Sequence, residues 1–144
     1  RYEPIHTVYL QYDDAVRLPK AMLGLSGGIA QWAFDRGAIA GQRGLIAAII
    51  SAGGPHTALT LEEIALRVHD DLARALGRLP APAWWRVIAE KRATFACVKD
   101  VQRPQHQTPL TGFHLAGDYT DSDYPGTIEA AVRSGLACAR AVIA

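Results

Sequence analysis

A carboxylate and a predicted helix start lie close together near the end of the sequence, and these residues are the best suited to chemistry. Asp118 follows a short apolar segment, residues 115–117, and Pro125-Gly126-Thr127 opens a helix predicted to run from residue 127 to about residue 143. The first N–H groups of a helix have no partner within it and carry a partial positive charge. Such an end attracts phosphates, oxyanions or the electron-rich edge of a ring. A carboxylate on the preceding strand end accepts hydrogen bonds from sugar or polyol hydroxyls, so the pattern predicts one wall of a cofactor site.

The predicted terminal helix carries small residues on one side, which allow a backbone or a flat ring to approach closely. Close packing of a helix on a sheet needs the same residues, so this feature by itself does not decide between the two. The neighbouring Gly117 and Asp118 favour contact with a cofactor. The small residues are Ala130, Ala131, Ser134, Gly135 and Ala139.

Apolar and β-branched segments upstream of this motif predict a sheet with one packed helix. The third strand is continuously apolar and is therefore expected at the centre of the sheet. Thr60 and Glu63 form a capping box at the start of the helix, and Gly77 is its predicted C-cap. The predicted strands are residues 4–12, 31–36, 45–51, 84–96 and 113–116.

Glycines and prolines separate these elements into turns and loops. Turns are predicted around residues 24–28, a hairpin-like connection over residues 37–44, and a polar loop over residues 99–112. Strands joined by hairpins, with one well-formed helix, predict an α+β fold with a mainly antiparallel or mixed sheet. The final strand, turn and helix instead look like the last unit of a nucleotide-binding α/β domain.

The size and charge of the chain limit the fold it can form and the kinds of partner it can bind. Its 144 residues are enough for one domain with a core, and 49% of them are apolar. The formal net charge is +1 without any basic stripe, which argues against nucleic acid as the main partner. The longest apolar run, residues 45–50, is too short to span a bilayer. The chain starts at Arg1 rather than at a methionine, so we expect a fragment of a longer protein.

Other candidate sites are weaker. Cys97 and Cys138 form no paired motif and are predicted to be buried, reduced thiols of a cytosolic protein. The acidic turn at residues 121–126 begins like a calcium loop but lacks oxygen ligands at the fifth and twelfth positions, so no metal site is predicted.

The glycine motif at residues 24–28 matches the nucleophile elbow of serine hydrolases, with Ser26 as the nucleophile. The following residues alternate like a strand rather than a helix, so a plain glycine turn is the favoured interpretation. A serine hydrolase is kept as an alternative, and a non-enzymatic binding or assembly module is another. The candidate triad partners of Ser26 are Asp70, Asp100, His106 and His114.

Residues 115–120 (Leu-Ala-Gly-Asp-Tyr-Thr) and residues 124–135 (Tyr-Pro-Gly-Thr-Ile-Glu-Ala-Ala-Val-Arg-Ser-Gly) together resemble the C-terminal FAD motif of the flavin amine oxidase and phytoene desaturase superfamily. Residues 30–37 and 89–96 are similar to the squalene-associated FAD-dependent desaturases, the hydroxysqualene dehydroxylases of hopanoid synthesis. The resemblance covers nearly the whole chain, but only the C-terminal third or so of such an enzyme. The family's N-terminal Gly-x-Gly-x-x-Gly unit, which grips the ADP half of FAD, does not occur in the sequence.

The resemblance implies roles for individual residues. Asp118 would hold a ribityl or nearby hydroxyl, and Gly117 would allow close approach of the pyrophosphate. Backbone groups of Thr127 and Ile128 would face the O2 edge of the isoalloxazine ring and stabilise negative charge there. Ala130-Ala131 stands where the family usually has Gly-Ala. The implied cofactor-binding residues are Gly117, Asp118, Pro125, Gly126, Thr127, Ile128 and Ala131.

The resemblance also implies a domain organisation and an activity. Residues 1–112 would belong to a substrate-binding domain with an apolar cavity, and residues 113–144 would be the last strand and helix of the FAD-binding domain. The full-length protein is expected to be an FAD-dependent oxidoreductase acting on a squalene-type or carotenoid-type isoprenoid, with no catalytic acid or base assigned. This chain alone is expected to bind FAD weakly or not at all, and to be inactive. We further expect a cytoplasmic location, peripheral contact with the inner face of the membrane, and pairing of two copies that buries the uncovered cofactor face.

Overall fold

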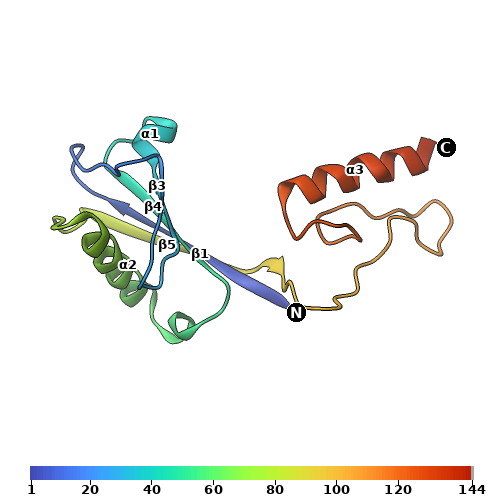
Figure 1. Cartoon of the computed structure of the whole chain (residues 1–144), viewed down its shortest axis with the longest axis horizontal. Coiled ribbons are helices and arrows are strands. Elements are labelled where there is room, and N and C mark those ends of the chain that lie inside the picture. Colours follow the sequence, from blue (N-terminus) through green and yellow to red (C-terminus); the bar gives the residue numbers. More distant parts are fainter. Residues whose placement is uncertain (144) are drawn as a thin grey trace. The chain divides into compact units, whose positions relative to one another are not determined.

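The computed structural model of the chain describes residues 1–143, which form two compact units (Figure 1). The first unit comprises residues 3–93. The second comprises the chain from Thr94 onward, together with Arg1 and Tyr2. The domain boundary expected between residues 112 and 113 stays a prediction.

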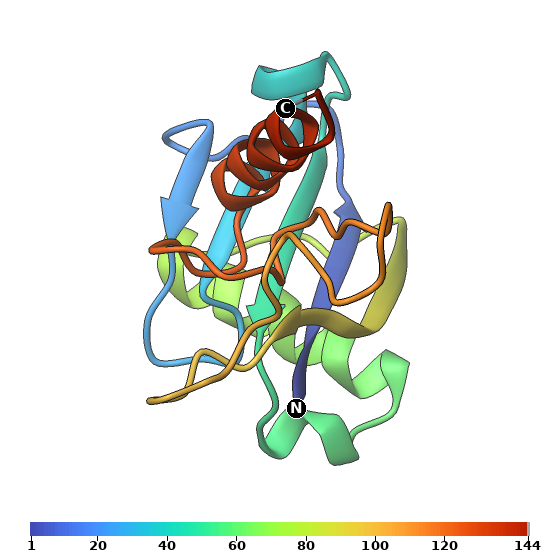
Figure 2. The same cartoon turned by 90° about the vertical axis from the view of Figure 1, so that its right-hand side faces the viewer.

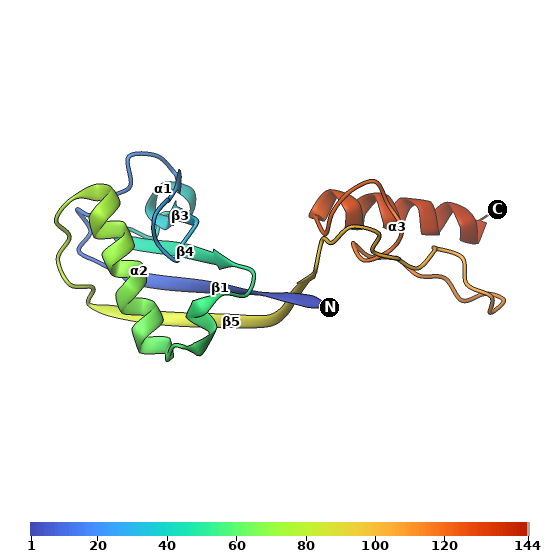
Figure 3. The same cartoon turned by 60° about the horizontal axis from the view of Figure 1, so that its bottom comes forward.

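A five-stranded sheet forms the first unit, with the strand order β2-β3-β4-β1-β5. The pairs β2/β3, β3/β4 and β1/β4 are antiparallel, and the combination of this sheet with helices confirms the predicted α+β fold. β4 is the central strand, as its continuous apolar sequence predicts (Figures 2 and 3). The strands are β1 (Tyr2–Gln11), β2 (Met22–Gly24), β3 (Trp32–Asp35), β4 (Leu45–Ser51) and β5 (Trp84–Phe95).

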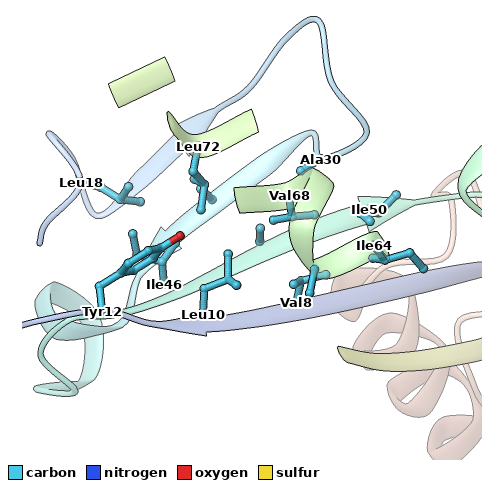
Figure 4. Packing of buried hydrophobic residues seen from close by; sticks show 13 residues of the cluster. Val8, Leu10, Tyr12, Leu18, Ala30, Ile46, Ile50, Ile64, Val68 and Leu72 are labelled. Atoms are coloured by element: carbon cyan, nitrogen blue, oxygen red, sulfur yellow. The ribbon is translucent and has the colours of Figure 1, made fainter. Parts of the chain in front are cut away.

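The helix α2 (Leu61–Leu76) covers one face of the sheet and closes the core (Figure 4). Thr60 Oγ1 accepts from Glu63 N at 3.2 Å, and Glu63 Oε2 accepts from Thr60 N at 2.7 Å, so the predicted capping box is confirmed. Core residues alternate along the strands and recur every three or four residues along α2, which places both sets in one interface. They include Val8, Leu10, Ile46, Ala48, Ile50, Ile64, Val68 and Leu72.

The opposite face of the sheet carries apolar and aromatic side chains. Tyr9 pairs with Ala47, and Ala47 pairs with Phe34, so these positions lie in one row across three strands. Ile49 pairs with Trp32, whose side chain is 43% exposed. Because successive residues of a strand point to opposite faces, this row lies away from α2. Trp32 and Phe34 therefore share one face, as predicted.

Two short elements differ from the sequence prediction. A helix, α1 (Arg36–Ala40), replaces the expected hairpin-like connection after β3. Asp35 ends β3 and caps α1, because its carboxylate accepts from Ala38 N at 2.9 Å, and Gly41 ends the helix with φ 71°. β2 forms where only turns are predicted, since three residues are too few for a periodic pattern and the strand is defined by its pairing with β3.

The second unit contains one long helix, α3 (Ile128–Ile143). The predicted strand at residues 113–116 is wrong: in the described part of the chain this segment makes a single isolated bridge, between His114 and Gln107. An apolar segment becomes a strand only where a partner satisfies its backbone groups, and one bridge does not.

Both cysteines are free, and Cys97 is exposed, contrary to its predicted burial. No helix within residues 1–143 is long and apolar enough to cross a membrane.

Asp71 of α2 holds the loop between β2 and β3 against the core. Its carboxylate accepts from Ile29 N at 2.8 Å and from Ala30 N at 3.1 Å, and it pairs with Arg74 at 3.1 Å. A Cβ at Gly28 would overlap this carboxylate. Glycine is therefore required at residue 28 for the close approach of loop and helix.

Gly28→Ala should lower the free energy of unfolding by ~2–4 kcal/mol, because the added methyl group must displace Asp71 from two backbone N–H groups. Urea unfolding followed by circular dichroism measures this change. Ser26→Ala, an exposed substitution in the same loop, is the matched control and should change stability by less than about 0.5 kcal/mol. Equal stability of Gly28→Ala and the wild-type protein would contradict the expected overlap.

Two buried histidines meet where β1 lies beside a short 3-10 turn, Pro55–Ala58. The rings of His6 and His56 are in edge-to-face contact, with centroids 5.2 Å apart. His6 Nδ1 and His56 Nε2 are buried and have no hydrogen-bond partner among the described residues. Burial, and to a smaller extent the neighbouring His56, lower the pKa of His6 below its ordinary value.

The lowered pKa of His6 predicts a loss of stability in acid. Because the folded state favours neutral His6, the unfolded state binds more protons once the pH falls below the ordinary histidine pKa of about 6.5. His6→Gln removes the titrating group and should therefore reduce the fall in the urea midpoint between about pH 8 and pH 5.5. An identical pH dependence of the variant and the wild-type protein would show that another group is responsible.

Candidate cofactor site

All seven residues predicted to contact a cofactor lie in the second unit, and the structure brings Asp118 together with the segment before α3. A Cβ at Gly126 would lie 3.2 Å from Asp118 Oδ2 and 2.5 Å from Thr94 Oγ1. Only glycine therefore allows the backbone at residue 126 to lie this close to the side chains of Asp118 and Thr94. Asp118 is half-buried, and no donor within residues 1–143 bonds its carboxylate. The carboxylate is therefore an acceptor without a protein partner, beside the approach to the helix.

The start of α3 keeps amide donors for a ligand. Thr127 Oγ1 accepts from Ala130 N at 3.2 Å, and Thr127 O accepts from Ala131 N at 3.1 Å. Among the residues that the structure describes, the N–H groups of Ile128 and Glu129 have no acceptor. One of the first amides is thus capped by Thr127, and two remain where the positive end of the helix dipole is concentrated.

Contacts around Tyr124 hold the loop that leads into α3. Arg103 Nη1 donates to Tyr124 O at 2.8 Å, and the guanidinium of Arg133 lies 4.9 Å from the centroid of the Tyr124 ring. Arg133 also pairs with Glu129 one turn earlier. These contacts fix Tyr124, the residue directly before Pro125. Pro125 itself is exposed.

Gly117 and Ala131 lie on either side of this loop in the sequence. Gly117 adopts φ 153°, and a Cβ there would crowd the ring of Tyr119. Ala131 is half-buried in the first turn of α3, and the adjacent Ala130 is 1% exposed. The side chain of Ile128 is 85% exposed, so the helix start presents both free amides and an uncovered apolar side chain.

Two hydroxyl side chains next to the predicted site were missed from the sequence. Thr120 is fully buried and Ser134 is 3% exposed, and both bond the backbone of Gly117. In the sequence pattern Ser134 was interpreted only as a small residue. Its hydroxyl could have indicated a further role, because a polar group on the packed side of a helix requires a hydrogen-bond partner.

This geometry fits part of a flavin. Asp118 offers an acceptor for a hydroxyl, while the amides of Ile128 and Glu129 offer donors to an electron-rich edge. Gly126 brings the two together. Ribityl hydroxyls and the O2 edge of an isoalloxazine ring meet these two demands, so the residues present fit this half of the cofactor.

Ser26 does not occupy a nucleophile elbow. It lies on the exposed loop between β2 and β3, which are antiparallel strands, whereas the elbow requires a strand that leads directly into a helix. The serine hydrolase alternative is therefore wrong.

The sequence matches the family described as flavin containing amine oxidoreductase over residues 1–143. It is 30% identical over 145 residues to a hydroxysqualene dehydroxylase of Rhodopseudomonas palustris and 31% identical over 141 residues to one of Zymomonas mobilis, with 99% and 96% of this chain covered. It is also 31% identical over 86 residues to a 15-cis-phytoene desaturase of Narcissus pseudonarcissus. This match covers 58% of the present chain and 15% of the desaturase.

The chain spans about a third of the length of the two dehydroxylases, 33% and 32% respectively. The resemblance inferred from residues 115–135 is confirmed by these matches. A flavin-containing family also supports FAD as the cofactor of the full-length protein. Sequence motif, site geometry and family match agree: the chain belongs to the flavin-containing amine oxidoreductases.

Proposed function

We propose that the chain is the C-terminal part of an FAD-dependent oxidoreductase that acts on a squalene-type or carotenoid-type isoprenoid. Its contribution is the turn and helix start that hold the flavin. The names of the relatives support this substrate class, because dehydroxylation of hydroxysqualene and desaturation of phytoene both concern long isoprenoid chains. By itself the chain lacks the Gly-x-Gly-x-x-Gly unit and should be inactive.

One observation carries the proposal: among the described residues, the carboxylate of Asp118 and the first amides of α3 have no partner, and Gly126 brings the two segments close together. Asp118 would accept a hydrogen bond from a ribityl hydroxyl, and Gly117 would leave room for the pyrophosphate. The amides of Ile128 and Glu129, with the positive end of α3, would stabilise negative charge at the O2 edge. FAD, when bound, supplies the hydride-transfer chemistry, and this chain positions and polarises it.

The open face of the sheet in the first unit suits an isoprenoid. Tyr9, Phe34 and Trp32 lie on the face away from α2, next to Ala47 and Ile49. The apolar and aromatic side chains of this row offer the non-directional contact that a hydrocarbon chain requires, and Thr7 is the polar neighbour of Ile49 on the same face. We therefore assign this row to the wall of the proposed substrate cavity.

Three further features belong to the same proposal. The full-length protein would work in the cytoplasm and meet the inner face of the membrane, where isoprenoids of this length dissolve. Two copies would pair where a cofactor-binding face is left uncovered. The charge pattern of the sequence, +1 overall, gives no reason to expect a nucleic-acid partner.

Asp118→Ala in the full-length protein should weaken FAD binding by roughly 10–100-fold, because a charge-assisted hydrogen bond contributes about 1.5–3 kcal/mol. Titration of the apoprotein with FAD, followed by flavin fluorescence, measures the dissociation constant. Asp123→Asn, an exposed carboxylate on the same loop, is the matched control and should leave the constant unchanged. Equal affinity of Asp118→Ala and the wild-type protein would remove Asp118 from the site, and a wild-type protein that never binds FAD would overturn the proposed function.

Trp32→Arg should raise the KM for the isoprenoid by about tenfold or more and leave FAD affinity unchanged, because a charge on the open face must be desolvated against a hydrocarbon. Steady-state turnover by the full-length enzyme and FAD titration provide the two readouts. Leu66→Arg is the control, since Leu66 is 55% exposed on α2. Equal KM values for the two variants would place the substrate elsewhere.

A further inference from the structure

The backbone of Gly117 is held at both of its polar groups by side-chain hydroxyls. Gly117 N donates to Ser134 Oγ at 2.8 Å, and Thr120 Oγ1 donates to Gly117 O at 2.8 Å. The two hydroxyl oxygens are themselves 2.8 Å apart. Gly117, Ser134 and Thr120 therefore form a closed hydrogen-bonded ring, which we call the hydroxyl ring.

The hydrogens of this ring can be assigned from its geometry. Thr120 has one hydroxyl hydrogen and gives it to Gly117 O, so Ser134 must donate to Thr120 Oγ1. Ser134 Oγ in turn accepts from Gly117 N. Within the ring each hydroxyl thus donates once and accepts once, and bonds arranged in this way polarise one another.

His106 supports the ring from a neighbouring loop. Its Nδ1 lies 3.3 Å from Leu115 O and 3.5 Å from Ser134 Oγ. Since the hydrogen of Ser134 is used on Thr120, His106 must carry its own hydrogen on Nδ1 and donate to these acceptors. Leu115 N donates to His106 O at 2.9 Å, so the segment before Gly117 is tied to the same loop.

Burial shields the hydrogen bonds of the ring from water. Thr120 is 0% exposed and Ser134 is 3% exposed, so water does not compete for these bonds. Glycine has the freest backbone of all residues, and Gly117 needs such restraint if its neighbour is to point in one direction. Ser134 lies on α3, six residues after Ile128, so the ring links the Gly117 backbone to the helix whose start offers the free amides.

We propose that Ser134 and Thr120 are positioning residues that hold Gly117, and through it the carboxylate of Asp118, in register with the first turn of α3. This inference rests on the proposed function, because it assigns the ring to the placement of the flavin contacts. A site held in its binding geometry before the ligand arrives loses less entropy on binding and binds more tightly. The two hydroxyls do not touch the cofactor in this assignment.

The test compares variants of the full-length protein by FAD titration. Ser134→Ala and Thr120→Val each remove one hydroxyl, and each should weaken FAD binding about tenfold or more. Because both substitutions break the same ring, their effects should not be additive. The dissociation constant of the double variant for FAD should exceed that of the more weakly binding single variant by no more than about threefold. Independent effects would instead multiply the two fold-changes. Thr120→Ser keeps the hydroxyl and should restore wild-type affinity.

Ser122→Ala is the matched control, because Ser122 lies close to Thr120 in sequence and, within residues 1–143, its hydroxyl bonds only Tyr124 N, at 3.1 Å. It should leave FAD affinity unchanged. Folded Ser134→Ala and Thr120→Val proteins with wild-type affinity would overturn the inference while leaving the proposed function intact. Failure of both variants to fold, judged by circular dichroism, would make the ring a folding element and overturn the positioning role. A wild-type protein without affinity for FAD would instead overturn the proposed function, and the inference with it.

Discussion

Within residues 1–143, the Asp118 carboxylate has no donor and the amides of Ile128 and Glu129 have no acceptor, and these open groups near the start of α3 make the second unit suited to bind a ligand. The carboxylate is half-buried and the residues that carry the amides are exposed, so both kinds of group are open to a ligand in place of water. A ligand that presents a hydroxyl to Asp118 and an electron-rich edge to Ile128 would bond both kinds of group at once. The close approach of Gly126 to Asp118 and the hydrogen bonds that restrain Gly117 keep these groups near one another.

In the first unit, the two faces of the sheet are covered differently. Its sheet buries one face under α2, where apolar residues from β1, β4 and α2 form the core. The other face presents aromatic and aliphatic side chains, among them Trp32 and Phe34. Exposed apolar side chains such as Trp32 on this second face favour a cover, which a hydrocarbon substrate would provide in the proposed full-length enzyme.

Local signals in the sequence were sufficient for some elements and misleading for others. Thr60 and Glu63 define the start of α2 by themselves, because a capping box involves residues only three apart. The candidate site residues were predicted from a short motif whose parts lie close in sequence. The strand expected at residues 113–116 failed because pairing requires a partner strand, which an apolar run does not provide. Ser134 was missed for a related reason: its hydroxyl acquires meaning only when the fold brings Gly117 and Thr120 to it.

A crystal structure of the full-length protein with FAD tests the central claim most directly. The claim predicts a ribityl or adjacent hydroxyl within hydrogen-bond distance of the Asp118 carboxylate, and the O2 edge of the isoalloxazine ring at the amides of Ile128 and Glu129. The claim would be contradicted if these amides and this carboxylate were bonded to other parts of the same protein, with the flavin bound elsewhere.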